Sequence, residues 1–158
     1  MSTEHLSTEP SQACAPTTDF CLRLARAHAV LIRRLDSALG SYHGISFSDY
    51  QVLYYLSRAP AARLRRVDLA ERLGLTASGV TRTLLPLEKI GLISREPDPR
   101  DARVGYAVVT PTGQELMRNA RSIIDQISHE QLKNVPAAEL AGMAAVLGQL
   151  AGIDPSNS

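Results

Sequence analysis

Residues 66–85 read RVDLAERLGLTASGVTRTLL, and the spacing of their small and apolar residues predicts a helix-turn-helix. Ala70, Gly74 and Val80 stand at its fifth, ninth and fifteenth places. A helix-turn-helix needs a small residue where its two helices approach, glycine in the left-handed turn and an apolar residue that packs the second helix on the first. Four leucines fill the other positions expected to be interior: Leu69, Leu73, Leu75 and Leu84. Helix pairs with a glycine turn also occur in proteins that bind no DNA, so the pattern is moderately specific.

The start of the second helix carries small and hydrogen-bonding residues: Thr76, Ala77, Ser78, Gly79, Thr81 and Arg82. Small residues let a helix enter the major groove, while hydroxyls and a guanidinium can meet phosphates and base edges. The helix N-terminus itself attracts phosphate. Thr76 also fits an N-cap, and capping is compatible with a phosphate contact. Pro86 predicts a bend beyond the groove-facing turns and not the end of the helix.

A β-hairpin is predicted after Gly91, with strands Leu92–Arg95 and Val104–Val109 and a charged tip between them. Arg100 and Arg103 stand in this tip beside two aspartates. An arginine at such a tip can enter a narrow minor groove, and a neighbouring aspartate can hold its guanidinium through a bidentate pair. In isolation the cluster would indicate an exposed salt-bridged turn. Directly after a helix-turn-helix, it favours a DNA-reading wing.

Long helices with apolar stripes stand on both sides of this unit. The first runs from Phe20 to Leu39, with Thr17, Thr18 and Asp19 as N-cap candidates, and the helix after Ser46 offers a capping box of Ser48 and Gln51. The other helices are expected at Arg66–Leu73, at Thr76–Ile90, from Thr110 and Pro111 onward, and from near Pro136. The fold class predicted is mainly α with a small β-hairpin wing. One domain is expected over residues 18–152, with the winged helix-turn-helix unit at 46–109, and tails at 1–17 and 153–158.

Composition fits one soluble domain of 158 residues, 44% of them hydrophobic. The sequence has no apolar run long enough to span a membrane, and its polar, acidic start is unlike a secretory signal, so a cytoplasmic protein with no membrane partner is expected. The net charge of +1 hides an uneven distribution. Residues 58–103 carry +4, whereas residues 1–20 carry −3 and residues 104–158 carry −2. Near-neutrality is therefore a cancellation and does not exclude DNA as the partner.

The run Asp101-x-Arg103, five residues, Val109-Thr110 and then Gly113 resembles the wing motif of MarR-type regulators, with Val in place of the usual Leu. The segments 67–75 and 80–93 resemble the two helices of that family's helix-turn-helix and its first wing strand. The resemblance covers roughly residues 20–150. It implies a homodimeric winged-helix transcription regulator, usually a repressor, that binds a pseudo-palindromic operator in double-stranded DNA. Residues 18–45 and 110–152 would form the dimerisation helices. Arg103 would be the minor-groove arginine with Asp101 as its brace, and the whole expected DNA site is Thr76, Ser78, Gly79, Thr81, Arg82, Arg100, Asp101 and Arg103.

Members of that family are often released from DNA by small anionic aromatic molecules bound between the dimerisation helices and the winged unit. A small-molecule inducer is therefore a further expected partner. The residues that could line its site here are His28, Arg34, Tyr42, His43, Tyr50 and Tyr54. Tyr50 and Tyr54 fit core packing as well, and His43 fits a loop.

Cys21 has two interpretations. It lies near the start of the first helix, where the helix dipole favours negative charge, and Phe20-Cys21-Leu22 resembles the cysteine position of the hydroperoxide-sensing branch of the family. It also falls on the apolar stripe with Leu24 and His28, which fits an inert buried cysteine. Cys14 would be a resolving thiol or a bystander. A metal site of Cys21 and His28 is excluded, since seven helical residues separate them by ~10 Å of rise.

Enzyme motifs are missing from the sequence: it contains no G-x-x-x-x-G-K-[ST], G-x-G-x-x-G, G-x-S-x-G or H-E-x-x-H. We therefore expect neither catalysis nor a cofactor. A winged-helix module for protein contacts is the remaining alternative, but it would require an apolar helix and wing where this sequence is basic.

Overall fold

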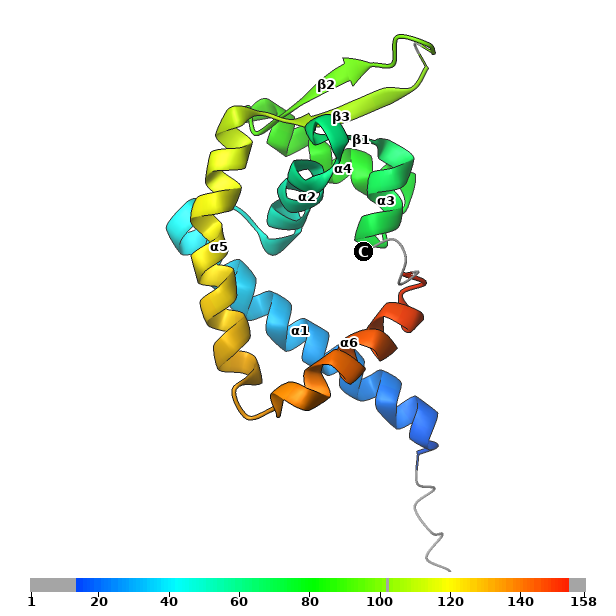
Figure 1. Ribbon diagram of the computed structural model, residues 1–158, viewed down its shortest axis with the longest axis vertical. Helices are drawn as coiled ribbons and strands as arrows, with labels where there is room; N and C mark the ends of the chain where they lie inside the picture. Colours follow the sequence, from blue (N-terminus) through cyan, green and yellow to red (C-terminus); the bar gives the residue numbers. More distant parts are fainter. Residues whose placement is uncertain (1–13, 102, 154–158) are drawn as a thin grey trace, which may run out of the picture.

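The computed structural model describes residues 14–101 and 103–153, and it confirms the mainly helical fold with a small β wing. The elements in chain order are α1 Pro16–His43, α2 Phe47–Arg58, the 3₁₀ turn η1 Pro60–Ala62, β1 Arg63–Arg65, α3 Arg66–Leu73, α4 Ala77–Lys89, β2 Ile93–Pro97, β3 Gly105–Val109, α5 Pro111–Leu132 and α6 Ala137–Leu150. In Figure 1 the winged unit of α2 to β3 occupies one end, α5 runs along the side, and α1 and α6 lie at the other end.

The long first helix begins earlier than expected. Its first residue is Pro16 and its N-cap is Ala15, which makes no side-chain capping hydrogen bond, so the predicted caps Thr17, Thr18 and Asp19 are wrong. Proline is favoured at the first helical position because its fixed φ suits the helix and its missing N–H is not needed there. This start lies inside the predicted tail 1–17. Residues 1–13 and 154–158 of the two predicted tails lie outside the described residues.

Helix α2 starts with a capping box formed by other residues than predicted. The Ser46 hydroxyl accepts from the Asp49 N–H at 3.1 Å, and the Asp49 carboxylate accepts from the Ser46 N–H at 2.8 Å. The predicted pair Ser48 and Gln51 lies two residues too late, since the chain becomes helical already at Phe47. The Phe47 N–H donates to Asp36 of α1 at 2.7 Å, so a side chain from α1 satisfies another N-terminal donor of α2.

The helix-turn-helix forms at the predicted positions. Helix α3 ends at Gly74, which adopts a φ of 64° in the left-handed turn, and Val80 and Leu69 are fully buried between the helices. Pro86 lies inside α4, which continues to Lys89. Leu75 is 40% exposed, so its predicted interior place is wrong. It lies in the turn itself, where its N–H closes the end of α3 on the Ala70 carbonyl.

The sheet has three strands and not the two of a simple hairpin. Strand β1 pairs antiparallel with β3, and β3 pairs with β2, so the order is β1-β3-β2. Strand β1, Arg63–Arg65, is too short to be predicted from the sequence, although Leu64 is buried between two more exposed arginines, as a half-buried strand requires.

The sheet joins α5 through a tight contact. Thr110 caps α5 as predicted, accepting from the Gly113 N–H at 3.1 Å, and its hydroxyl can donate to the Leu92 carbonyl at 3.0 Å. A Cβ on Gly113 would lie 2.1 Å from that Leu92 oxygen. Only glycine fits here, because a backbone carbonyl cannot move aside as a flexible side chain can.

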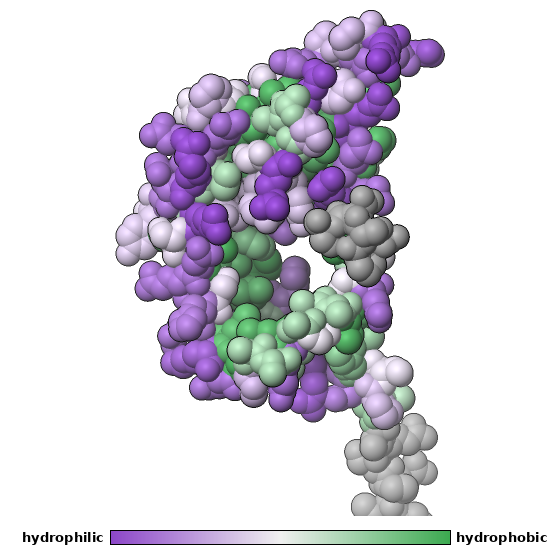
Figure 2. All heavy atoms as spheres, in the orientation of Figure 1, coloured by the Kyte–Doolittle hydropathy of each residue, from purple (hydrophilic) through white to green (hydrophobic). Residues whose placement is uncertain are grey.

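The hydrophobic core belongs mainly to the winged unit and the first half of α5, with Leu53, Leu69, Leu84 and Ala120 among its fully buried members. Helix α6 differs, since none of its residues 137–150, all of them described, is buried. Figure 2 shows hydrophobic residues gathered at the end of the molecule where α6 lies. No helix within the described ranges is long and apolar enough to cross a membrane.

Candidate nucleic-acid interface

The first turn of α4 presents its predicted polar residues at the surface. Thr76 is the N-cap, and its hydroxyl accepts from the Gly79 N–H at 3.2 Å and lies 3.2 Å from the Ser78 hydroxyl. Thr81, half-buried, donates to the Ala77 carbonyl at 3.2 Å. The short side chains leave the helix N-terminus uncovered, so its N–H groups and hydroxyls can reach a phosphate. Arg82 is exposed one position further along this helix.

The wing tip presents Arg103, whose side chain is 92% exposed. One oxygen of Asp101, Oδ1, accepts from the Arg103 backbone N–H at 3.0 Å and from its Nε at 3.3 Å. The pair is therefore not the bidentate fork predicted from the sequence, because a contact over two residues in a turn brings the backbone N–H and Nε to the same oxygen. The outer nitrogens of the guanidinium form no hydrogen bond with the described part of the chain, and they remain available to an acceptor such as DNA.

Asp98 organises the base of the tip, a role that sequence analysis missed. It is the one buried charged residue among those described, only 6% exposed. Its Oδ1 accepts from the Arg100 backbone N–H at 2.8 Å, while Oδ2 accepts from the Tyr106 hydroxyl at 3.3 Å and from Nη2 of Arg65 at 3.2 Å. These contacts, the Arg100 N–H first and then the Tyr106 hydroxyl and the Arg65 charge, lower the pKa of Asp98 below its usual value.

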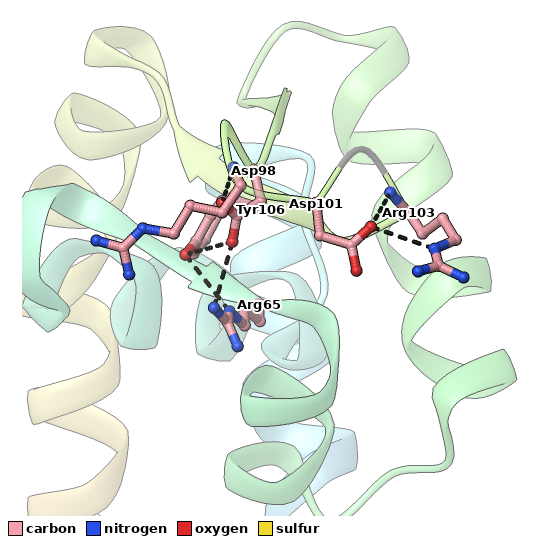
Figure 3. A network of polar contacts seen from close by, with 6 residues as sticks. Arg65, Asp98, Asp101, Arg103 and Tyr106 are labelled. Atoms are coloured by element: carbon pink, nitrogen blue, oxygen red, sulfur yellow. Dashed lines mark hydrogen bonds and ion pairs between the residues drawn. The ribbon is translucent and has the colours of Figure 1, made fainter.

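Arg65 and Tyr106 close a ring with this carboxylate. Nε of Arg65 donates to the Tyr106 hydroxyl at 3.4 Å, so each of the three side chains contacts the other two (Figure 3). Tyr106 lies on the central strand β3, directly opposite Arg65 of β1. The guanidinium of Arg63, also on β1, lies 4.5 Å from the centre of the Tyr106 ring. Figure 3 shows Asp101 and Arg103 as a separate pair beside this cluster.

The expected DNA residues thus fall into two groups on one winged unit. Thr76, Ser78, Gly79, Thr81 and Arg82 lie at the start of α4, whereas Arg100, Asp101 and Arg103 lie in the segment between β2 and β3. Arg100 is exposed and shares the turn held by Asp98. The alternation of Arg63, Leu64 and Arg65 is the sequence signal that could have revealed β1 and its arginines.

Four of the six residues expected around a ligand line two separate cavities. One, of about 720 Å³, lies between α1 and α5 and is lined by Arg34 and Tyr42 among others. The second, of about 320 Å³, lies between α2 and α5 and is lined by Tyr50, Tyr54, Arg58 and Arg121 among others. His28 and His43 line neither of these two cavities.

Stacked aromatic rings form one wall of the cavity between α2 and α5. The Tyr50 and Tyr54 rings stack with centres 6.2 Å apart, and the Arg58 guanidinium lies 5.6 Å from the Tyr54 ring centre. Tyr50 is buried, as its core interpretation requires, and burial together with the nearby Asp125 charge raises the pKa of its hydroxyl. Arg121 contributes a second cation, paired with Asp125 at 3.6 Å.

Cys21 is exposed on α1, and Cys14 is exposed just before that helix. The interpretation of Cys21 as a buried packing residue is therefore wrong within this chain. The stripe on which it falls is mostly uncovered by the described residues along this part of α1: His28 is exposed as well, and Leu24 is only half-buried.

Comparisons with known proteins agree with this architecture. Residues 43–104 match the model of the MarR family. The uncharacterized HTH-type transcriptional regulator YdgJ of Bacillus subtilis (strain 168) is 30% identical over 107 residues, which are 68% of this chain. The matched part spans 64% of that relative's own length, somewhat less than two thirds.

Two solved structures extend the similarity over most of the chain. Sco3205, a MarR family transcriptional regulator from Streptomyces coelicolor solved in complex with DNA, superposes with a TM-score of 0.81 at 25% identity and covers 96% of both chains. CouR from Rhodococcus jostii RHA1, solved with p-coumaroyl-CoA, has a TM-score of 0.76 at 22% identity, covering 87% of this chain and 94% of its own. The match over the winged unit, the related HTH-type sequence and the common fold show that this chain is similar to MarR family regulators and has their winged-helix fold.

Proposed function

We propose that this protein is a sequence-specific DNA-binding regulator that inserts the start of α4 into the major groove and the wing tip into the minor groove. The observation that carries the proposal is Arg103, whose side chain is 92% exposed at the wing tip and held by Asp101. Holding a long exposed side chain in one conformation costs conformational entropy, which a binding partner can offset. The narrow minor groove concentrates the negative potential that would attract this arginine. The polar, uncovered N-terminus of α4 supplies the second contact.

Arginine substitutions test this proposal. Fluorescence anisotropy at fixed salt would compare a duplex selected by the protein from a randomised pool with an unrelated duplex of equal length. Arg103→Ala should weaken binding of the selected duplex by about 1–3 kcal/mol, and Arg82→Ala should also change which sequences are selected. Arg118→Ala, an equal loss of charge at an exposed position of α5, is the matched control and should have little effect. Equal losses for all three variants would contradict the proposal.

The protein acts as a homodimer in this proposal, with α1, α5 and α6 as the dimerisation helices. Support comes from α6, where Met143, Val146, Leu147 and Leu150 are 46–59% exposed although they are apolar. So large an apolar surface is unusual on a monomer and fits an interface. Leu147→Glu should convert a dimer to a monomer in sedimentation velocity, while Val67→Glu, at an exposed apolar position of α3, should leave the dimer intact.

A pseudo-palindromic operator follows from a two-fold dimer, because two identical reading units require two related half-sites. Repression is the proposed result of binding there. Footprinting on the selected duplex should show two protected half-sites, one helical turn or a multiple of it apart. Transcription in vitro from a promoter carrying that duplex should fall as protein is added. An increase would make the protein an activator.

A small aromatic anion is the proposed inducer, bound in the cavity between α2 and α5. Stacked tyrosine rings can receive an aromatic ring, and Arg58 and Arg121 can receive a carboxylate. Benzoate and salicylate are suitable first probes. Titration of the DNA complex with them should release DNA from the wild type but not from Tyr54→Ala. Tyr42→Ala, in the cavity between α1 and α5, tests the alternative site.

Thiol-based peroxide sensing through Cys21 is the second candidate, and the exposure of this thiol favours it. Peroxide should then release DNA from the wild type, and Cys21→Ser should keep its DNA under the same treatment. Cys14→Ser, the other exposed cysteine, is the control that separates a sensing thiol from a bystander. A Cys21→Ser protein that still responds to peroxide would remove the candidate.

A further inference from the structure

The wing tip is anchored to the helix-turn-helix through one buried carboxylate. Asp98 stands where β2 ends, and its N–H donates to the Val104 carbonyl at 2.9 Å, which closes the tip. Its side chain reaches across the sheet to Arg65, the N-cap residue of α3. Contacts from Asp98 therefore join the wing tip directly to the first helix of the helix-turn-helix.

The hydrogen-bond partners of Asp98 fix the orientation of its side chain. The carboxylate uses both oxygens, and the Tyr106 hydroxyl bridges it to Arg65. A buried carboxylate with hydrogen-bond partners on both oxygens is held more firmly than an exposed ion pair. If it lost these partners while buried, nothing would compensate for its lost hydration. Asp101 and Arg103 stand only three and five residues further along the same turn, so their orientation depends on how this base is held.

We propose that Asp98 is a positioning residue for DNA recognition: together with Tyr106 and Arg65 it fixes the wing tip relative to α3 and thereby determines where Arg103 meets the minor groove. This inference rests on the proposed DNA-binding function. A positioning role also explains why a carboxylate stands at the base of the wing tip, where its charge would repel the phosphates of bound DNA.

That repulsion gives a test with opposite signs. Asp98→Asn removes one negative charge from the wing, so a purely electrostatic role predicts tighter binding of every duplex. A positioning role predicts about tenfold weaker binding of the duplex selected by the wild type, with binding of an unrelated duplex unchanged or slightly tighter. Glu96→Gln is the matched control, because it removes the same charge two residues earlier, on β2, and breaks the ion pair with Arg63. It should tighten binding slightly on both duplexes.

A double variant shows whether Asp98 acts through Arg103. If it does, Asp98→Asn combined with Arg103→Ala should bind the selected duplex no more weakly than Arg103→Ala alone. Tyr106→Phe keeps the ring stacked by Arg63 but removes the bridging hydroxyl, and it should weaken binding by about threefold. Circular dichroism melts establish that each variant folds, and Tyr106→Phe carries the test if Asp98→Asn does not.

Unchanged or tighter binding of the selected duplex by a folded Asp98→Asn protein would overturn the inference, as would full additivity with Arg103→Ala. If Asp98→Asn fails to fold, wild-type affinity in Tyr106→Phe overturns it. A wild-type protein that selects no duplex at all would instead overturn the proposed function.

Discussion

The winged unit and the long helices that flank it place their apolar residues in opposite ways. In the winged unit Leu53, Leu69 and Val80 are fully buried within the single chain. In α6 none of the described residues 137–150 is buried, and Leu147 and Leu150 are about half exposed. The winged unit is thus stabilised by its own residues, while the flanking surface is the part suited to a second copy.

The largest effect is expected from a cavity in the winged core. Leu53→Ala should lower the free energy of unfolding by about 3 kcal/mol, because the lost leucine was fully buried. Leu147→Ala should cost far less in dilute protein and more as the protein concentration rises, if its partner is another chain. Urea unfolding at two protein concentrations measures both. Equal, concentration-independent losses would remove the contrast between the two regions.

A smaller effect is expected at the cap of α4. Thr76→Ala leaves the Gly79 N–H without its acceptor and should lower the free energy of unfolding by about 1 kcal/mol. Thr76→Ser keeps a hydroxyl and should lose only a few tenths of that value. Thermal unfolding of the three proteins in parallel makes the comparison, and an equal loss in the serine variant would show that the hydroxyl is not the cause.

The smallest effect concerns acid. Contacts in the fold lower the pKa of Asp98, so its unfolded pKa, about 3.9, is the higher of the two. The carboxylate therefore adds stability above about pH 4, and this contribution is lost as the pH falls through the folded pKa. The difference in unfolding free energy between wild type and Asp98→Asn should be constant near neutral pH and shrink below about pH 4. If the difference in unfolding free energy is unchanged at pH 2.5, the substitution acts through packing or hydrogen-bond geometry and not through the charge of Asp98.

Local signals predicted the helix-turn-helix well. Gly74 and Thr76 mark the turn and the second helix because their conformations are dictated by residues within one turn of them. Thr110 and Pro111 start α5 for the same reason. Predictions of helix starts failed where several neighbouring residues could act as the N-cap. The capping box of α2 uses Ser46 and Asp49, and α1 starts at Pro16 and not after Thr18, because either choice satisfies the local rules.

The part of the candidate site that could not be predicted from the sequence depends on contacts between residues far apart in the chain. The contact of Asp101 with Arg103 spans two residues and was predictable, although its geometry was not. The contact of Asp98 with Arg65 spans 33 residues and depends on β1, whose three residues give almost no periodic signal. Leu75 was assigned to the interior from its residue type, but the turn that it occupies faces solvent.

The tight contact of Gly113 with Leu92 makes α5 a lever arm. Its start is held against the sheet by a backbone that leaves no space for even a methyl group, so the winged unit must follow any tilt of this helix. The 22 residues of α5 span about 33 Å. A tilt of about 3° at one end therefore displaces the other by about 2 Å, which is enough to separate hydrogen-bonded atoms. A displacement of about 2 Å at the flanking end of α5 would thus tilt the attached winged unit by about 3°.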